Sequence, residues 1–98
     1  MHAQLVIAQY RSGKVDEGMQ IYRESVLPAA RQQRGFKGAL GLVDPSTGKG
    51  MSITLWETEA DAQASGTNTP YLQEQLAKVA SLMVAAPVVE TYEVTVQE

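Results

Sequence analysis

Alternating hydrophobic and polar positions predict four β-strands in this chain. Residues 3–11 (AQLVIAQYR) are apolar on both alternating faces, which is typical of a strand covered on both sides. Residues 36–43 and 50–57 are two further runs of this kind, and residues 44–49 between them are rich in turn formers. Residues 88–96 (VVETYEVTV) alternate again and predict a C-terminal strand.

The segment from 15 to 34 repeats with the period of a helix instead. Its apolar residues recur every three or four positions, and Gly35 follows it as a residue suited to end a helix. Pro28 lies inside this segment. Because proline lacks a backbone donor and clashes with the preceding turn, we expect a kink or a break near Leu27. A broken helix over a sheet can open a gap beneath it.

A second helical region begins at Thr58. Thr58 and Asp61 have the spacing of an N-terminal capping box, and the short helix that they open should stop near Gly66. Thr69 followed by Pro70 has the composition of another helix start, and apolar residues then recur at helical spacing.

The resulting order, βαββαβ, predicts one α+β domain over residues 1–98. With right-handed crossovers it gives a ferredoxin-like, four-stranded antiparallel sheet with both helical regions on one face. The strands are apolar on both faces, whereas the helices can cover only one. On the 50–57 strand, the side expected to remain open carries Met51, Ile53 and Leu55. We therefore expect a homodimer in which two sheets pack face to face.

Composition excludes several classes of function. The formal net charge of -3 argues against a nucleic-acid partner, because such binding depends on cationic contacts to phosphate. The chain has no cysteine, and no spacing of histidines or carboxylates predicts a metal site. No apolar run approaches the roughly 20 residues that span a bilayer, and no signal peptide is evident. We expect a cytoplasmic protein without a metal, a cofactor or a membrane partner.

Four residues are candidates for binding a small ligand. Trp56, the only tryptophan, could stack on a flat aromatic compound, or it could be a core residue that closes the end of the sheet. Tyr10 and Tyr22 could donate hydroxyl hydrogen bonds into a pocket, as could Tyr71 and Tyr92, although packing explains the positions of all four. Asn68 could orient a ligand carbonyl, although a role in capping the next helix also accounts for it.

The remaining candidates have simpler explanations. His2 is the only histidine and lies near the terminus, where chains usually fray. The basic residues Arg31, Arg34 and Lys37 could hold an anionic substituent at a pocket rim, or be a solvated helix end. The segment 44–50 contains Gly-Lys but otherwise lacks the phosphate-loop pattern, so it is predicted to be a turn.

Two passages resemble the antibiotic biosynthesis monooxygenase family, within the dimeric α+β barrel superfamily. Residues 34–42 (RGFKGALGL) are similar to the second strand of that family, and residues 55–62 (LWETEADA) are similar to its tryptophan passage. The resemblance implies a ferredoxin-like protomer, a homodimer that forms a dimeric α/β barrel, and a pocket between helices and sheet.

For activity, the resemblance implies two kinds of enzyme. One kind comprises cofactor-free oxygenases of anthrones or quinols, in which the substrate supplies electrons to oxygen and the protein orients it and manages a proton. The other kind degrades haem. This chain has Gln4 and Gln9 where the haem-degrading branch has an asparagine, and it has no histidine over residues 64–69. These differences argue against haem degradation.

Two hypotheses follow. The first is a cofactor-independent oxygenase acting on a small aromatic, quinol-like or anthrone-like compound. Trp56 would position the substrate, Tyr10 or Tyr22 would relay a proton, and Asn68 would orient a carbonyl. The second is a non-catalytic module that binds a small molecule or serves assembly. A fully packed space beneath the first helix would leave only the assembly version.

Overall fold

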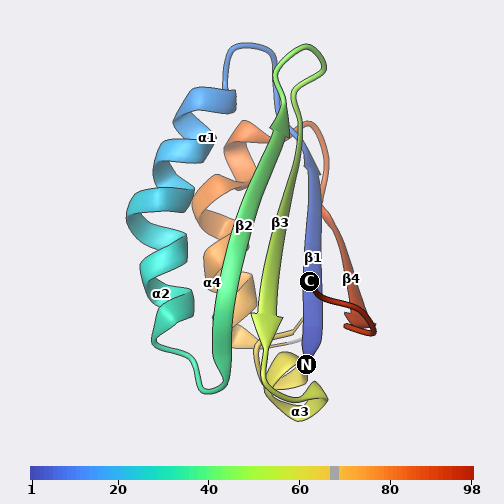
Figure 1. Ribbon diagram of the computed structural model, residues 1–98. Helices are drawn as coiled ribbons and strands as arrows, with labels where there is room; N and C mark the ends of the chain where they lie inside the picture. The colour runs from blue at the N-terminus through green and yellow to red at the C-terminus, as the bar shows by residue number, and fades with distance from the viewer. Residues whose placement is uncertain (67–68) are drawn as a thin grey trace.

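A computed structural model of the chain describes residues 1–66 and 69–98 (Figure 1). The four strands form one sheet in the order β2-β3-β1-β4, in which every neighbouring pair is antiparallel. This arrangement confirms the predicted α+β, ferredoxin-like fold. The elements in chain order are β1 (His2–Gln9), α1 (Val15–Ile21), η1 (Tyr22–Val26), α2 (Leu27–Arg31), β2 (Phe36–Asp44), β3 (Lys49–Trp56), α3 (Glu59–Ala64), α4 (Pro70–Val79), η2 (Ala80–Leu82) and β4 (Val88–Glu93).

The helices lie on one side of the sheet. Figure 1 shows α1, α2 and α4 side by side along one face, with the short helix α3 at the end where β3 finishes. The opposite face of the sheet has no helix over it. None of the described helices is long and apolar enough to cross a membrane.

The first helical region is continuous, so of the kink or break expected near Leu27 the break is not found. The chain instead widens into a π-helix over Tyr22–Val26, directly before Pro28. The Leu27 N–H donates to the carbonyl of Tyr22, five residues earlier, which is the π-helical spacing. This shift in register accommodates a residue that cannot donate, without separating the helix into two pieces.

Both predicted helix starts are confirmed. The Thr58 hydroxyl accepts from the Asp61 N–H at 3.0 Å, and the Thr69 hydroxyl accepts from the Leu72 N–H at 3.2 Å. Three elements end two or three residues earlier than predicted. β1 ends at Gln9 rather than residue 11, helix α2 ends at Arg31 rather than residue 34, and β4 ends at Glu93 rather than residue 96.

The turn between β2 and β3 is confirmed as well. Gly48 has a positive φ of 77°, and its N–H donates to the Asp44 carbonyl at 2.9 Å. The strand register then follows from this turn, and Leu40 lies opposite Ile53 while Gly41 lies opposite Ser52.

The register divides the sheet into two unlike faces. The face beneath the helices, here called the covered face, carries Gln4 and Val6 from β1 and Ser52 and Thr54 from β3. The opposite face, here called the open face, is mainly apolar. Its central residues are Leu5, Ile7, Leu40, Leu42, Met51, Ile53 and Leu55.

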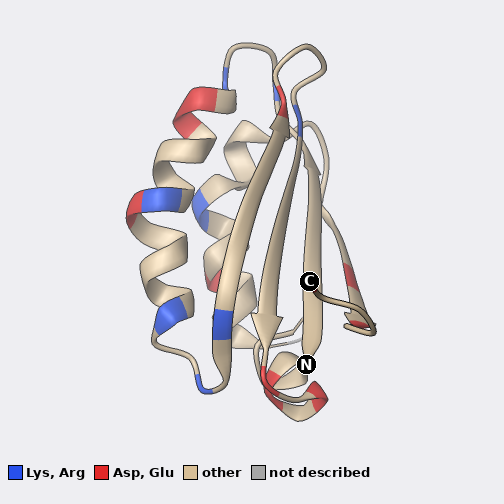
Figure 2. Ribbon diagram, viewed as in Figure 1, with Lys and Arg blue, Asp and Glu red and all other residues tan. Residues whose placement is uncertain are grey.

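Charged side chains avoid the middle of the sheet. Strands β1, β2 and β3 carry them only near strand ends, at Lys37, Asp44 and Lys49. Figure 2 shows the other charges mainly on the helices and connecting segments, with acidic residues also on β4. The open face therefore has few charges to keep it in water.

Candidate functional site

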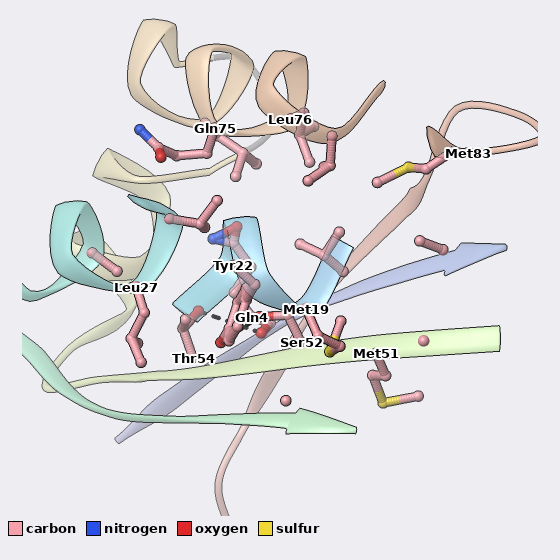
Figure 3. A pocket seen from close by; sticks show the side chains of 18 of the residues that line it. Gln4, Met19, Tyr22, Leu27, Met51, Ser52, Thr54, Gln75, Leu76 and Met83 are labelled. Atoms are coloured by element: carbon pink, nitrogen blue, oxygen red, sulfur yellow. Dashed lines mark hydrogen bonds between the residues drawn. The ribbon is translucent and has the colours of Figure 1, made fainter. Parts of the chain in front are cut away.

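A pocket lies between the covered face of the sheet and the helices (Figure 3). Its cavity measures about 80 Å³, within a hollow of about 830 Å³ that includes open solvent. The lining is mainly apolar, and none of the described residues that line it is charged. The space beneath the first helix is therefore not fully packed, and a small-molecule site remains open to both hypotheses drawn from the sequence.

Small residues on the sheet create much of this space. Gly41, Gly50, Ser52 and Ala8 form part of the lining where larger side chains would fill it. The helices supply the opposite wall. The lining residues from helices α1, η1, α2 and α4 are Met19, Tyr22, Val26, Leu27, Ala30, Tyr71, Leu72, Gln75, Leu76 and Val79.

Trp56 closes one end of the pocket. Its side chain is 1% exposed, and its ring meets Phe36 edge to face at a centroid distance of 6.0 Å. The indole N–H donates to the Thr54 hydroxyl at 3.0 Å. Because that donor is already engaged, Trp56 offers the pocket its aromatic surface. It is thus both a core residue and a pocket wall, which combines the two alternatives drawn from the sequence.

Tyr22 reaches the covered face from the first residue of the π-helical segment. Its ring packs on Gly41, where an added Cβ would lie 3.3 Å from the Tyr22 Cε2. Its hydroxyl oxygen accepts from the Ser52 hydroxyl at 3.1 Å (Figure 3). Because each hydroxyl can both donate and accept, this bond uses one of the two hydrogens and leaves the other for a ligand.

Tyr10 lines the same pocket but is held more tightly. Its ring lies between Gly18 of α1 and Gly50 of β3, where added Cβ atoms would lie 2.4 Å and 3.0 Å from ring carbons. Only glycine fits at Gly18 without a shift of that ring. Tyr10 also belongs to the buried cluster of Ala8, Val79, Leu82 and Met83 that closes this end of the core.

Tyr71 also lines the pocket, although the sequence analysis preferred Tyr10 and Tyr22 for the site. Burial, together with the neighbouring Tyr22, raises the pKa of Tyr71, and the same two causes raise the pKa of Tyr10. Both phenols therefore stay protonated to higher pH than a free tyrosine, so each hydroxyl can act as a hydrogen-bond donor. Hydroxyls of this kind orient and relay hydrogen atoms more readily than they abstract them.

Two glutamines are the most buried polar side chains that line the pocket. Gln4 of β1 is 2% exposed and Gln75 of α4 is 5% exposed. The Gln4 amide nitrogen donates to the Ser65 carbonyl at 3.0 Å, whereas the Gln75 amide oxygen accepts from the Lys78 ammonium at 2.8 Å. The sequence pattern marked Gln4 only as an amide on the first strand. Its period-two position opposite Thr54 was the signal that would have placed it on the covered face.

The other sequence candidates lie elsewhere. Asn68 falls outside the residues that the structure describes. Instead of fraying, His2 pairs with Trp56 and Glu93 within the sheet, and its Nε2 lies 3.8 Å from a Glu59 carboxylate oxygen. Arg31, Arg34 and Lys37 are exposed and do not line the pocket, so a solvated surface describes them.

No group of three or more histidine, cysteine, aspartate or glutamate side chains that could hold a metal is found within residues 1–66 and 69–98. The pocket offers instead an aromatic wall, neutral hydroxyls and one amide oxygen without a protein partner. Such a lining suits a neutral, largely aromatic compound.

Comparisons with known proteins agree with this picture at the level of the fold. No protein-family model matches the chain, and no curated protein matches it. Solved structures do. A monooxygenase from the gene ActVA-Orf6 of Streptomyces coelicolor, bound to nanaomycin D, has a TM-score of 0.79 and 14% identity, covering 99% of this chain and 89% of that one.

Two further structures assigned to the same family give similar values. The Deinococcus radiodurans protein has a TM-score of 0.77 and 15% identity over 100% of this chain and 96% of that one. A Nitrosomonas europaea protein described as an antibiotic biosynthesis monooxygenase has a TM-score of 0.76 and 19% identity, covering 98% of this chain and 100% of that one. This chain has the fold of the antibiotic biosynthesis monooxygenases. The fold implied by the resemblance of residues 34–42 and 55–62 is thus confirmed, and what this fold does here has to be argued from the pocket.

Proposed function

We propose that this protein is a cofactor-independent monooxygenase that acts on a small aromatic quinol-like or anthrone-like compound. The observation that supports this function most directly is the uncharged pocket, with the flat surface of Trp56 at one end and the Tyr22–Ser52 hydroxyl pair beside it. An electron-rich aromatic compound can react with oxygen without a cofactor once it loses a proton. The protein then has to bind, orient and shield it.

The proposed reaction balances without an external reductant. A quinol and O₂ give a hydroxyquinone and water, and an anthrone CH₂ group and O₂ give a carbonyl and water. In both cases the substrate supplies four electrons, one oxygen atom enters the product and the other leaves as water with two hydrogen atoms. No resident metal or flavin is required for this stoichiometry.

In this proposal the pocket residues have separate roles. Trp56 packs against the substrate ring. Tyr22 and Ser52 relay the proton that the substrate loses to the oxygen atom that leaves as water, because their hydroxyls already share a hydrogen bond and can pass hydrogen along it. The rigid position of Tyr10 between two glycines suits a wall better than a relay. Between the two tyrosines named from the sequence, Tyr22 is therefore the one to which we assign the relay.

Oxygen uptake with a panel of quinols and anthrones in metal-free buffer tests the proposal. Turnover is expected in the wild type. Tyr22→Phe should lower kcat by about 100-fold, the lower range for a positioned proton-transfer group. Tyr92→Phe is the matched control, because Tyr92 lies on β4 and its hydroxyl donates to Glu90 away from the pocket. Equal turnover in the two variants would contradict the relay, and no turnover above background would contradict the activity.

A non-catalytic binding module is the second candidate. It is favoured by the uncharged lining, because none of the described residues that line the pocket is a carboxylate or a histidine that could act as a base. This candidate predicts that aromatic compounds bind without oxygen uptake. The same panel, measured by binding and by oxygen consumption, separates the two functions.

We further propose that the chain forms a homodimer through the open face of its sheet. Leu40, Leu42, Val88 and Tyr92 are each about half exposed, at 57%, 47%, 55% and 53%. Together with Ile53 between them they form a mainly apolar surface of the kind that monomers rarely expose, although Glu90 lies on the same face between Val88 and Tyr92. A two-fold pairing of two such sheets would bury it. Sedimentation at micromolar concentration should give twice the chain mass, and a single monomeric species would contradict this assembly.

A further inference from the structure

One polar atom in the pocket has no protein partner. The amide oxygen of Gln4 is fully buried and accepts no hydrogen bond from residues 1–66 or 69–98. Buried acceptors are usually satisfied, because an unpaired one loses its bond to water without a replacement. The position of Gln4 in the pocket lining suggests that the missing donor belongs to a ligand.

The orientation of this amide follows from its neighbour. The Gln4 nitrogen lies 3.0 Å from the backbone carbonyl of Ser65, which can only accept a hydrogen bond. The reverse assignment would bring two acceptors together, so the nitrogen must face Ser65 and the oxygen must face away from it. Ser65 is itself 2% exposed, which makes this anchor part of the core.

Gln4 is also tied to the aromatic wall. The Thr54 hydroxyl donates to the Gln4 backbone carbonyl at 3.4 Å and accepts from the Trp56 indole at 3.0 Å. Figure 3 shows Gln4, Thr54, Ser52 and Tyr22 gathered on the sheet side of the pocket, with Gln75 and Leu76 on the helix opposite. A ring that packs on Trp56 would thus have a fixed acceptor within the same group of residues.

We propose that the Gln4 amide oxygen receives the hydroxyl hydrogen of an aromatic substrate, and so selects phenols and quinols. This inference rests on the proposed function and defines its substrate class. The uncharged lining disfavours a carboxylate, which would lack a cation, and an ammonium group, which would be costly to bury. A neutral O–H group satisfies the acceptor without either penalty.

The same acceptor would distinguish the substrate from its oxidised product. A quinol presents an O–H donor to the Gln4 oxygen, whereas a quinone presents a carbonyl oxygen at that place. Two acceptors facing one another cannot share a hydrogen bond. Gln4 would therefore hold the reduced compound and favour release of the oxidised one.

Phenol and toluene test this selection directly, because they have nearly the same shape and differ by a hydroxyl and a methyl group. Their dissociation constants can be measured by NMR from the indole N–H signal of Trp56, the only tryptophan and a pocket residue. Gln4→Met removes the acceptor at similar volume. It should weaken phenol relative to toluene by about tenfold, the loss of one hydrogen bond.

Gln75→Met is the matched control. Gln75 lines the same pocket and is similarly buried, but its amide oxygen already accepts from Lys78. The ratio of phenol to toluene affinity should therefore remain as in the wild type. An unchanged ratio in Gln4→Met, an equal change in both variants, or no binding of either compound to the wild type would overturn the proposal.

Should Gln4→Met fail to fold, the wild type still decides the question. Phenol should shift the Gln4 side-chain amide signals, which are identified by their proximity to Ser65, and toluene should leave them nearly unchanged; equal shifts would overturn the proposal. Neither readout depends on oxygen uptake. Selective phenol binding without turnover would support the role of Gln4 and contradict the oxygenase activity. Turnover with no effect at Gln4 would support the activity and contradict the role of Gln4.

Discussion

The covered and the open face of the sheet are built from the same strands and have opposite properties. On β3, Gly50, Ser52 and Thr54 face the helices, while Met51, Ile53 and Leu55 face away from them. The helices do cover a face, but that face carries the smaller and more polar side chains. The larger aliphatic side chains gather where the protomer has no second layer (Figure 1).

This contrast explains where the pocket comes from. The sequence suggested that a break at Pro28 could open a gap beneath the helix, but the helix continues through a π-helical segment. The space lies instead over glycine and serine on the sheet, where helix side chains find too little to pack against. Small residues on the covered face thus leave space for a ligand, whereas large apolar residues on the open face form a surface suited to packing against another protein.

The largest expected effect is a difference between the two faces in how much an alanine substitution lowers the free energy of unfolding. Trp56→Ala should lower the free energy of unfolding by about 3–5 kcal/mol, because it removes a large buried side chain and leaves a cavity. Leu40→Ala on the open face should lower it by less than about 1 kcal/mol in the monomer. Urea unfolding at protein concentrations that keep the chain monomeric measures both. Similar losses at the two sites would refute the contrast.

The second prediction concerns assembly. Ile53→Asp places a charge at the centre of the open face, between Leu5 and Leu40. It should weaken the proposed dimer by about 100-fold or more, because a lone carboxylate would be buried between two sheets. Gln32→Asp adds the same charge at an exposed position after α2 and should leave the dimer intact. Sedimentation velocity distinguishes these outcomes, and equal behaviour of the two variants would exclude the open face as the interface.

A third prediction tests the packing of Tyr10 in the covered layer. Alanine usually stabilises a helix relative to glycine, but a Cβ at Gly18 would lie 2.4 Å from a Tyr10 ring carbon. Gly18→Ala should therefore destabilise the protein by about 1–3 kcal/mol. In a Tyr10→Leu background, which lacks that ring, the same substitution should cost clearly less. A thermal-unfolding cycle of the four proteins measures the coupling, and additive effects would mean that the ring does not constrain Gly18.

The smallest effect is expected at alkaline pH. Burial raises the pKa of Tyr71 above the ordinary value of 10.0, so folding favours the neutral phenol. Its contribution to stability is fully present below pH 10 and is lost as the pH rises through the raised pKa. Tyr71→Phe should reduce this alkaline loss.

Tyr92→Phe on the open face is the comparison for this titration. The pKa of Tyr92 is raised too, by its hydrogen bond to Glu90 and the charge of that carboxylate, but the pair is exposed and screened by solvent. Removing it should change the alkaline loss less than Tyr71→Phe does. Urea midpoints between pH 8 and 11 provide the measurement, and the opposite order would show that burial in the pocket is not the main cause.

Much of the fold was predictable because its signals are local. Alternation gave all four strands, and the caps at Thr58 and Thr69 gave the two helix starts of the second region. The response of the first helix to Pro28 was not predictable. A kink, a break and a π-helical turn can each accommodate the N–H donor that Pro28 lacks. The π-helical turn places Tyr22 on Gly41, and this contact belongs to the tertiary structure.

The candidate site was predictable only in part. Trp56, Tyr10 and Tyr22 were named from residue type and position, and all three line one pocket. Tyr71 was not preferred over the other tyrosines and Gln75 was not found, because a tyrosine or glutamine within a helix has the same pattern whether it faces a cavity or a filled core. Gln4 could be recognised only from the structure. Its amide nitrogen donates to the carbonyl of Ser65, which is distant in sequence, and its amide oxygen then has no partner among the described residues.

The sequence by itself determined the order of the elements, the two unlike faces of β3 and the absence of cysteine chemistry, since these depend on composition and on periods of a few residues. Only the tertiary structure decided how the first helix accommodates Pro28, through a π-helical segment whose Tyr22 packs on Gly41. It also decided which of two buried glutamines keeps a free acceptor. Both depend on contacts between residues far apart in the chain, which no local pattern encodes.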